Sequence, residues 1–291
     1  MREAGDGADR PGTDTQLLRY VYTAWSRRSG GLSLGLDLTP QGHCSFSCVY
    51  CQASHPPIRN PDLSVDLGRL RNELTNKLRS LGADELRDLV LAGSGEPTSV
   101  PNVADALRAI RGVCDDAGFQ RPRRIFTNGR HLNRVEIAET LVDWVGWGGE
   151  VWVKLDGATE ATIEAVNGRR FEVARHLEGI WGLARRCEIG VQTMVVRGPS
   201  LPEPAAAVKE VAEAIATGLN GGAKIRELHL ITLSRVPSDA AQASVLRAVE
   251  AAELRGLAEE MARLTGLSVQ AYGAAADEDR QHGLESGVTA D

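Results

Sequence analysis

The sequence has little positive charge and few aromatic residues. Its 291 residues include 33 Lys or Arg against 39 Asp or Glu, which gives a formal net charge of −6, and aromatic residues make up only 4%. A protein whose main task is to wrap a nucleic acid usually carries a basic stripe, so this balance argues against that class. The hydrophobic content of 42% is still enough for one large core or two small ones.

Long apolar runs and paired cysteines are also missing. No stretch approaches the roughly 18 apolar residues of a membrane span. The opening segment MREAGDGADRPGTD has no apolar stretch behind its charges, so we expect no secretory signal. The five cysteines are an odd number, and three of them lie within eight residues. This pattern disfavours a disulfide framework and indicates a metal site in a reducing, cytoplasmic compartment.

The chain divides into a long patterned region and two polar ends. Residues 1–14 and 274–291 lack periodicity, and we expect both to be disordered. Between them, in 15–273, short Val-, Ile- and Leu-rich segments predict strands, listed here in chain order: 32–38, 89–92, 124–127, 151–155, 189–196 and 227–233. Helical apolar spacing predicts helices over 67–81, 103–113, 135–144, from Thr159, and over 171–186, 204–218 and 245–264.

This alternation predicts an α/β fold. Six βα units in series indicate one domain with a parallel sheet that is covered by helices. The pattern leaves two closures open, namely a doubly wound sheet and a barrel or part of one. Both place the functional site at the carboxyl ends of the strands.

Three cysteines follow the first predicted strand with the spacing C-x3-C-x2-C: Cys44, Cys48 and Cys51. Thiolates on one short loop suit a soft metal centre. A closed zinc site would want a fourth protein ligand. His43 is a poor candidate because sequence neighbours rarely point at the same ion. The pattern therefore fits a [4Fe–4S] cluster with one open iron, with a structural zinc site or three buried thiols as alternatives.

The residues around these cysteines, SLGLDLTPQGHCSFSCVYCQ with Tyr50 before the last cysteine, resemble the radical S-adenosylmethionine (SAM) superfamily. They are most similar to the branch that includes wyosine-type tRNA-modifying enzymes. The resemblance runs from about Leu32 to Arg235. It implies a partial (β/α)6 barrel of the TIM type, with a [4Fe–4S] cluster and SAM as cofactors. It also implies an external electron donor of the flavodoxin or ferredoxin type, and a 5′-deoxyadenosyl radical that abstracts hydrogen from substrate.

A glycine-rich motif follows the second predicted strand, and its residues are Gly93, Ser94, Gly95, Glu96 and Pro97. Glycines at a strand end let the backbone approach a ligand closely. Without further context, however, such a motif indicates only a turn. The motif resembles the superfamily's Gly-Gly-Glu-Pro, which holds the ammonium group of SAM, and a buried carboxylate suits that role. Ser94 departs from the pattern and could crowd the ammonium slightly.

The ends of later strands supply the remaining candidates. The resemblance assigns cofactor binding to five side chains there: Asn128, Lys154, Asp156, Gln192 and Thr232. Lys154 stands where relatives have Ser, and it could pair with the cofactor carboxylate, with an anionic substrate or with Asp156. Asp156 alternatively caps the following helix. Arg197 and Arg235 are substrate candidates. For two other features we expect a structural role. His229 is expected to be a core histidine, and residues 167–170 are expected to end a helix with arginines at the surface.

Three functions remain open. The leading one is a radical SAM enzyme for a small molecule, because no second cysteine set and no room for a cobalamin domain are present. Modification of a tRNA base needs a basic surface that the charge does not favour. A non-enzymatic iron–sulfur or zinc protein is the third. The outcome of the radical reaction stays open between dehydrogenation, rearrangement and epimerisation. Cys114 and Cys187 are not placed to quench a substrate radical, which disfavours cysteine-dependent epimerisation.

Overall fold

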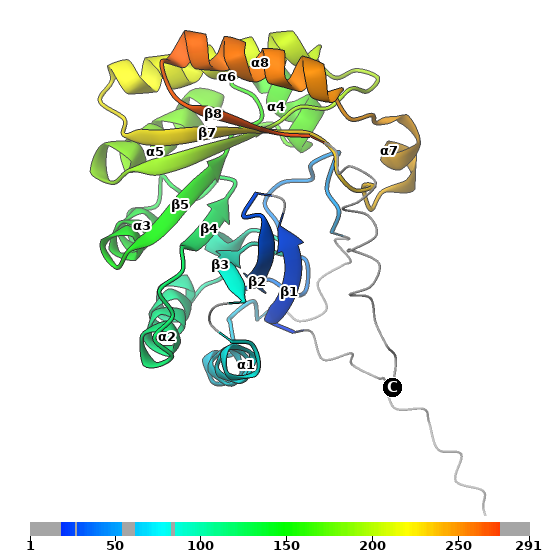
Figure 1. Ribbon diagram of the computed structural model, residues 1–291. Coiled ribbons are helices and arrows are strands. Elements are labelled where there is room, and N and C mark those ends of the chain that lie inside the picture. The colour runs from blue at the N-terminus through cyan, green and yellow to red at the C-terminus, as the bar shows by residue number, and fades with distance from the viewer. Residues whose placement is uncertain (1–18, 27, 54–61, 83–84, 274–291) are drawn as a thin grey trace, which may run out of the picture.

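A single curved sheet organises the molecule, which a computed structural model describes over residues 19–26, 28–53, 62–82 and 85–273 (Figure 1). The polar ends predicted to be disordered, 1–14 and 274–291, lie outside the described residues. The strands follow one another across the sheet in chain order. They are β1 Val21–Ser26, β2 Gly31–Leu36, β3 Leu86–Leu91, β4 Arg123–Thr127, β5 Gly149–Lys154, β6 Ile189–Met194, β7 Ile225–Ile231 and β8 Val269–Tyr272.

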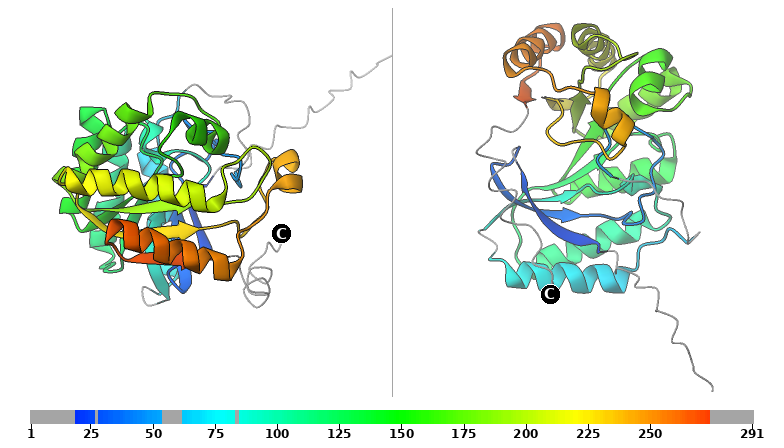
Figure 2. Two further views of the ribbon diagram at one scale, coloured as in Figure 1. Left: turned by 90° about the horizontal axis from the view of Figure 1, so that it is seen from above. Right: turned by 90° about the vertical axis from the view of Figure 1, so that its right-hand side faces the viewer.

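All neighbouring strands pair in parallel except β1, which pairs antiparallel with β2. Helices line the outer face of this sheet, except the short α7, which lies beyond the strand ends, as the views in Figures 1 and 2 agree. They are α1 Leu67–Ser80, α2 Val103–Asp116, α3 Val135–Gly146, α4 Glu160–Asn167, α5 Val173–Arg186, α6 Pro204–Asn220, α7 Ala240–Val245 and α8 Ala251–Thr265, with a 3-10 turn, η1, at Pro97–Ser99. The predicted single-domain partial barrel is confirmed.

Two strands were not predicted, and one predicted helix is wrong. Edge strand β1 has both faces partly exposed, so its sequence VYTAWS shows no clear alternation. Strand β8 is only four residues long. The helix expected over 245–264 starts at Ala251 instead, after a stretch that is held extended. There Arg247 forms an isolated bridge with Arg197, and the backbone N–H of Val249 donates to Thr232 Oγ1.

Alternation along the central strands divides the side chains between two cores. Leu89, Ile125 and Val151 belong to the large apolar cluster between sheet and helices. Their neighbours point to the opposite face, into the barrel. Phe126 and Trp152 form a separate cluster there, with ring centroids 5.9 Å apart. The barrel interior therefore has its own packed cluster of apolar side chains, separate from the core between the sheet and the helices.

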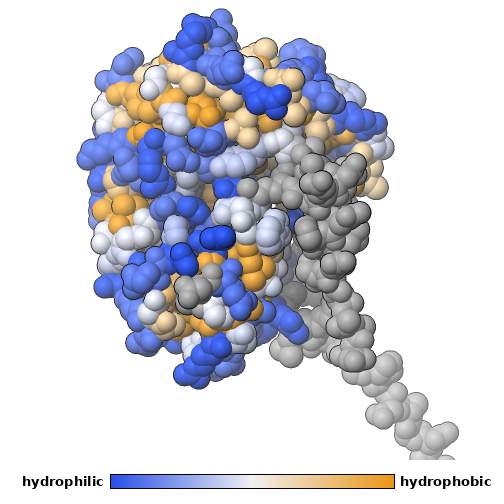
Figure 3. All heavy atoms as spheres, in the orientation of Figure 1, coloured by the Kyte–Doolittle hydropathy of each residue, from blue (hydrophilic) through white to orange (hydrophobic). Residues whose placement is uncertain are grey.

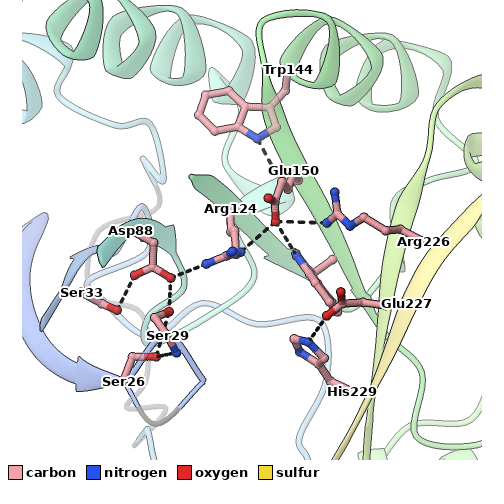
Figure 4. Close-up of polar contacts among 11 residues, drawn as sticks. Ser26, Ser29, Ser33, Asp88, Arg124, Trp144, Glu150, Arg226, Glu227 and His229 are labelled. Carbon is pink, nitrogen blue, oxygen red and sulfur yellow. Dashed lines mark hydrogen bonds and ion pairs between the residues drawn. The ribbon is translucent and has the colours of Figure 1, made fainter. Parts of the chain in front are cut away.

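Charged side chains close the bottom of the barrel below these rings (Figure 4). Arg124 lies between Asp88 and Glu150, and its Nε is 2.8 Å from the Glu150 carboxylate. Arg226 reaches the same Glu150 oxygen at 3.1 Å. His229 is buried, stacks on Trp152 with centroids 3.9 Å apart, and bonds Glu227 through Nε2. The prediction of a core histidine is confirmed, with its location in the barrel interior, but only Nε2 is hydrogen-bonded and Nδ1 has no partner in the described structure.

The outer surface carries hydrophilic side chains with hydrophobic residues in small, separate groups on the face shown in Figure 3. Among the described residues, no helix has both the length and the apolar character needed to cross a bilayer.

Candidate functional site

The three cysteines lie on the loop that follows β2, and the end of α4 holds this loop in place. The backbone N–H of Ser47 donates to the Asn167 carbonyl (2.9 Å), and that of Val49 donates to the Val166 carbonyl (3.0 Å). Gly168 ends α4 in the left-handed region at φ 63°. A Cβ at this position would lie 2.5 Å from the Ser47 carbonyl oxygen, so only glycine permits this docking.

Two asparagine side chains donate to cysteine sulfurs. Asn167 Nδ2 lies 3.2 Å from Cys48 Sγ, and Asn128 Nδ2 lies 3.8 Å from Cys44 Sγ. Burial raises the pKa of the Cys48 thiol to about 11 and also raises the pKa of Cys44. A metal centre that binds these sulfurs as thiolates therefore has to displace their protons. The amide donors would then stabilise the resulting negative charge.

Asp156 anchors the elements that surround the cysteines. Its carboxylate accepts hydrogen bonds from the Tyr50 hydroxyl, from Asn167 Nδ2 (2.8 Å) and from the Met194 backbone N–H (2.9 Å). It does not cap the following helix, because Thr159 accepts the bond from the N–H of Thr162 at that position. Asp156 thus ties the cysteine loop, α4 and β6 together while it faces the site.

Glu96 is the second anchor, and it is buried. Its Oε1 accepts from the backbone N–H and hydroxyl of Thr98 (3.0 and 2.6 Å) and from the Thr127 hydroxyl (2.6 Å). Oε2 accepts from the backbone N–H of Asn128 (2.7 Å). A carboxylate oxygen has about two acceptor sites, so Oε2 keeps one for a further donor.

The glycines of the same motif make room for the chain itself. A Cβ at Gly95 would lie 1.8 Å from the His43 carbonyl oxygen, and one at Gly93 would lie 2.2 Å from Asp37 Cγ. That His43 carbonyl accepts a hydrogen bond from the N–H of Glu96 (2.9 Å). These glycines are therefore required by the approach of the cysteine loop and of the end of β2. Their part in cofactor binding stays a prediction.

Lys154 enters the site from the end of β5. Its Nζ lies 5.9 Å from the centroid of the Tyr50 ring. Burial by itself would lower the pKa of the Lys154 ammonium, but attraction to Cys48, Asp156 and the other two cysteines outweighs burial and raises the pKa. Lys154 is the cation that balances the negative groups of this site.

Most of the predicted site residues meet in one small cavity of about 100 Å³. The predicted residues that line it are Cys44, Cys48, Tyr50, Cys51, Gly93, Ser94, Gly95, Glu96, Asn128, Lys154 and Asp156. Pro97 is buried and begins η1 behind the motif. Gln192, Thr232 and Arg235 line a wider, neighbouring cavity of about 430 Å³. Both cavities include Ala92 in their walls, so they adjoin.

Arg197 is not brought to either cavity. It is exposed after β6, and its guanidinium binds Glu203 (2.9 Å) and Glu253 (2.6 Å). Conversely, Asn167 is a site residue that the sequence predictions treated as part of a surface helix stop. Its position directly before Gly168 gave no distinguishing signal, because many helices end at a glycine.

The three cysteines of the site could each bind a different iron of a multi-iron cluster. Three separate thiols on one loop face the same cavity, and amides donate to two of the sulfurs. Within the described ranges, no three His, Cys, Asp or Glu side chains are grouped as ligands of a single metal ion. The residues present therefore fit the [4Fe–4S] cluster that the cysteine spacing indicates.

A buried histidine behind the cysteine loop predicts acid sensitivity. Neither ring nitrogen of His176 has a hydrogen-bond partner in the described structure, and burial followed by repulsion from Arg130 lowers its pKa to about 4. The unfolded chain, with an ordinary histidine pKa near 6.5, binds more protons below that pH. The contribution to stability is thus complete above about pH 6.5, and it is lost at roughly 1.4 kcal/mol per pH unit as the pH falls toward 4.

Urea unfolding between pH 7 and pH 5 measures this loss. We expect His176→Phe, which keeps an aromatic ring against Phe171, to flatten the dependence of the unfolding free energy on pH. Equal slopes in the variant and the parent would contradict the assignment.

Comparisons with known proteins give one curated relative of moderate coverage. No family model matches the chain. A UPF0026 protein from Synechocystis sp. is 28% identical over 172 residues, which are 57% of this chain and 61% of that protein. The match thus spans less than two thirds of the relative's length. The GTPase Obg of Brachyspira hyodysenteriae is 30% identical over 119 residues, which are 40% of this chain and only 16% of the GTPase.

Among solved structures, a radical SAM methyltransferase from Sphaerobacter thermophilus matches with a TM-score of 0.60. The sequences are 13% identical, and the match covers 86% of this chain and 68% of that one. At this identity the likeness shows a common fold. The resemblance expected from the cysteine loop is thus confirmed at the level of the fold.

Proposed function

We propose that this chain is a radical SAM enzyme that acts on a small molecule. The observation that carries the proposal is the small cavity, in which three cysteine thiols, two buried carboxylates and one lysine converge. A [4Fe–4S] cluster bound there, with SAM reaching from it into the adjoining cavity that Gln192 and Thr232 line, would supply reductive cleavage of the cofactor and hydrogen abstraction from substrate. An external one-electron donor of the flavodoxin or ferredoxin type would deliver the electron.

Different residues of the chain would bind the cluster, the ammonium group and the carboxylate group of SAM. Cys44, Cys48 and Cys51 would hold the cluster and leave one iron for the cofactor. The remaining acceptor site of Glu96 Oε2 suits the ammonium of SAM, because a buried carboxylate and an ammonium form a charge-assisted bond. Lys154, the cation of the same cavity, suits the cofactor carboxylate.

The neighbouring cavity supports a substrate of small-molecule size. Its volume of about 430 Å³ lies within the range of about 300–1,000 Å³ that is usual for small-molecule sites. A small molecule can enter such a space, and the net charge of −6 disfavours a polyanion as the substrate. Which reaction follows hydrogen abstraction depends on the substrate that the cavity admits.

Cofactor cleavage tests the proposal directly. After anaerobic reconstitution with iron and sulfide, the chain with a reductant and SAM is expected to form 5′-deoxyadenosine and methionine. Iron content near four per chain should accompany this activity, as a single cluster requires. Firmly bound stoichiometric zinc without iron, or a loaded cluster that leaves SAM intact, would refute the proposal.

Glu96→Ala tests the ammonium site. We expect the variant to keep the cluster but to bind SAM about ten- to a hundredfold more weakly, because a buried charge-assisted bond is lost. Thr98→Val is the matched control, since it removes a donor to Oε1 but keeps the carboxylate charge. It should lower stability and leave the affinity for SAM within a few fold. Equal affinities in Glu96→Ala and the parent would remove Glu96 from the cofactor site.

A further inference from the structure

We propose that an arginine-rich surface beside the cysteine loop docks an acidic electron-carrier protein. This surface, the arginine face, consists of Arg130, Arg134, Arg169, Arg170 and Arg175. That the docked protein delivers the electron for SAM cleavage rests on the proposed function, whereas its binding to the arginine face does not.

Two segments form the arginine face, and both lie against the cysteine loop. They are residues 128–134, between β4 and α3, and residues 167–175, which run from the end of α4 into α5. Asn128 of the first segment donates from Nδ2 to Ser45 Oγ (3.0 Å). Arg169 of the second segment donates from Nε to the Ser45 carbonyl (3.1 Å). Ser45 directly follows the first of the three cysteines, so both segments contact the part of the chain that would hold the cluster.

The charge of these segments is opposite in sign to that of the chain. They contain five arginines and one acid, Glu172, whereas the whole chain has a net charge of −6. Two of the arginines bind acids that lie outside the segments. Arg134 binds Glu136 (2.8 Å). Arg170 binds Glu164 (2.7 Å). Five arginines against these three acids leave a net charge of +2 on this surface.

Three of the five arginines have no carboxylate partner in the part of the chain that the structure describes: Arg130, Arg169 and Arg175. Arg169 and Arg175 are exposed. Arg130 is positioned with its guanidinium 4.7 Å from the centroid of the Phe171 ring. Guanidinium groups that no acid of their own chain binds can accept the carboxylates of a partner, and their planar fork suits that contact.

Two stacked rings connect the arginine face with the site. Phe46 belongs to the cysteine loop and lines the small cavity. Its ring stacks on Phe171, with centroids 5.7 Å apart, and Phe171 in turn contacts Arg130. Ser47 of the same loop is exposed, and the three cysteines are only half-buried. Electron transfer slows steeply with distance, so a carrier that docks against this loop has a short route to the cluster.

The arginine face is separate from the space for cofactor and substrate. None of its five arginines lines the small cavity or the wide one. A protein that binds these arginines therefore leaves the lining of both cavities free for small molecules.

The size of the charge favours a protein over a nucleic acid. Tight binding of a nucleic acid typically involves roughly six to ten phosphate contacts, and a surface of net charge +2 does not supply them. Electron-transfer partners form small, transient interfaces below about 1,200 Å², and complementary charge mainly accelerates their encounter. A few unpaired arginines next to the cysteine loop meet that requirement when the carrier is acidic.

Binding to the reconstituted chain tests the docking surface. Calorimetric titration at low ionic strength would use an acidic flavodoxin as the probe, with cytochrome c as a basic carrier and tRNA as a polyanion. We expect flavodoxin to bind, its affinity to fall as salt is added, and cytochrome c not to bind. Binding of tRNA in place of flavodoxin would assign the surface to a nucleic acid and overturn the inference.

Substitutions locate the contact. Arg130→Gln and Arg175→Gln, combined in one chain, are expected to weaken flavodoxin binding about two- to thirtyfold, because two exposed charges are lost. Arg130→Lys with Arg175→Lys keeps both charges and should recover most of the affinity. Arg87→Gln is the matched control, since Arg87 is exposed at the start of β3, the opposite end of that strand from the site. It should bind flavodoxin as the parent does.

SAM cleavage with two reductants separates electron delivery from the chemistry. With saturating dithionite, the double glutamine variant should contain as much iron as the parent and form 5′-deoxyadenosine at the same rate. With reduced flavodoxin at low concentration, its rate should fall about in proportion to the loss of affinity.

Binding of cytochrome c in place of flavodoxin would overturn the inference. So would equal flavodoxin affinities in the double glutamine variant and the parent. Arginine-dependent binding of flavodoxin by a chain that cleaves no SAM with dithionite would refute the proposed function and support the docking surface. Cleavage with dithionite by a chain that binds no flavodoxin would refute the docking surface alone.

Discussion

Replacement of Cys44, Cys48 or Cys51 by alanine is expected to abolish iron binding and SAM cleavage together. Each thiol lines the same small cavity, and Cys44 and Cys48 each receive a hydrogen bond from a different asparagine. If each thiolate binds its own iron, removal of one leaves two ligands for a four-iron cluster. Iron and sulfide content, measured beside 5′-deoxyadenosine formation, should therefore fall to background in all three variants.

The other two cysteines provide the control. Cys114 lies in the buried core on α2, and Cys187 ends α5 at the opposite end of β6 from the site. Burial raises the pKa of each to about 11, so both are protonated core thiols. Cys114→Ala and Cys187→Ala should keep the cluster and turn over within a few fold of the parent. A variant of either that cleaves SAM without forming product would identify that thiol as a hydrogen donor to the substrate.

Gly95→Ala is expected to have the second-largest effect, although it adds only one methyl group. The new Cβ would lie 1.8 Å from the His43 carbonyl, which is backbone and cannot rotate away. The cysteine loop must therefore move, and the hydrogen bond from the Glu96 N–H to that carbonyl is lost with it. We expect a loss of about 1–3 kcal/mol in the free energy of unfolding and poor uptake of iron.

Ser94→Ala is the control for Gly95→Ala. It removes a hydroxyl from the neighbouring position but keeps the backbone N–H that donates to Asp37 (2.9 Å). Its melting temperature and iron content should match those of the parent. If Gly95→Ala also matched the parent in both measurements, the close approach of the cysteine loop would not be a constraint on this position.

Several features of the site could be predicted because their signals are local. The spacing of Cys44, Cys48 and Cys51 is visible in eight residues, and a loop of that length brings its own ligands together. The alternation that separates Lys154 from Val153 follows from strand geometry alone. The carboxyl ends of parallel strands share one edge of the sheet, so the GSGEP motif and Asn128 could be expected beside the cysteines.

Other features depend on contacts between distant segments. Asn167 reaches Cys48 across 119 positions, and nothing in its own neighbourhood distinguishes it from an ordinary helix end. Gly95 is required by a carbonyl more than fifty residues earlier, so the sequence could suggest a ligand but not the true neighbour. Arg197 and Arg235 both follow strand ends, and only the fold shows that acids bind the first while the second faces a cavity.

The sequence by itself determined the fold class, the succession of βα units along the chain and the loop of cysteines, because periodicity and short-range spacing encode these directly. The tertiary structure decided which groups face one another. The curvature of the sheet places Arg28, before β2, and Arg235, after β7, in the lining of one cavity. Such convergence results from the summed twist and register of many strands, and no single segment of the chain contains that information.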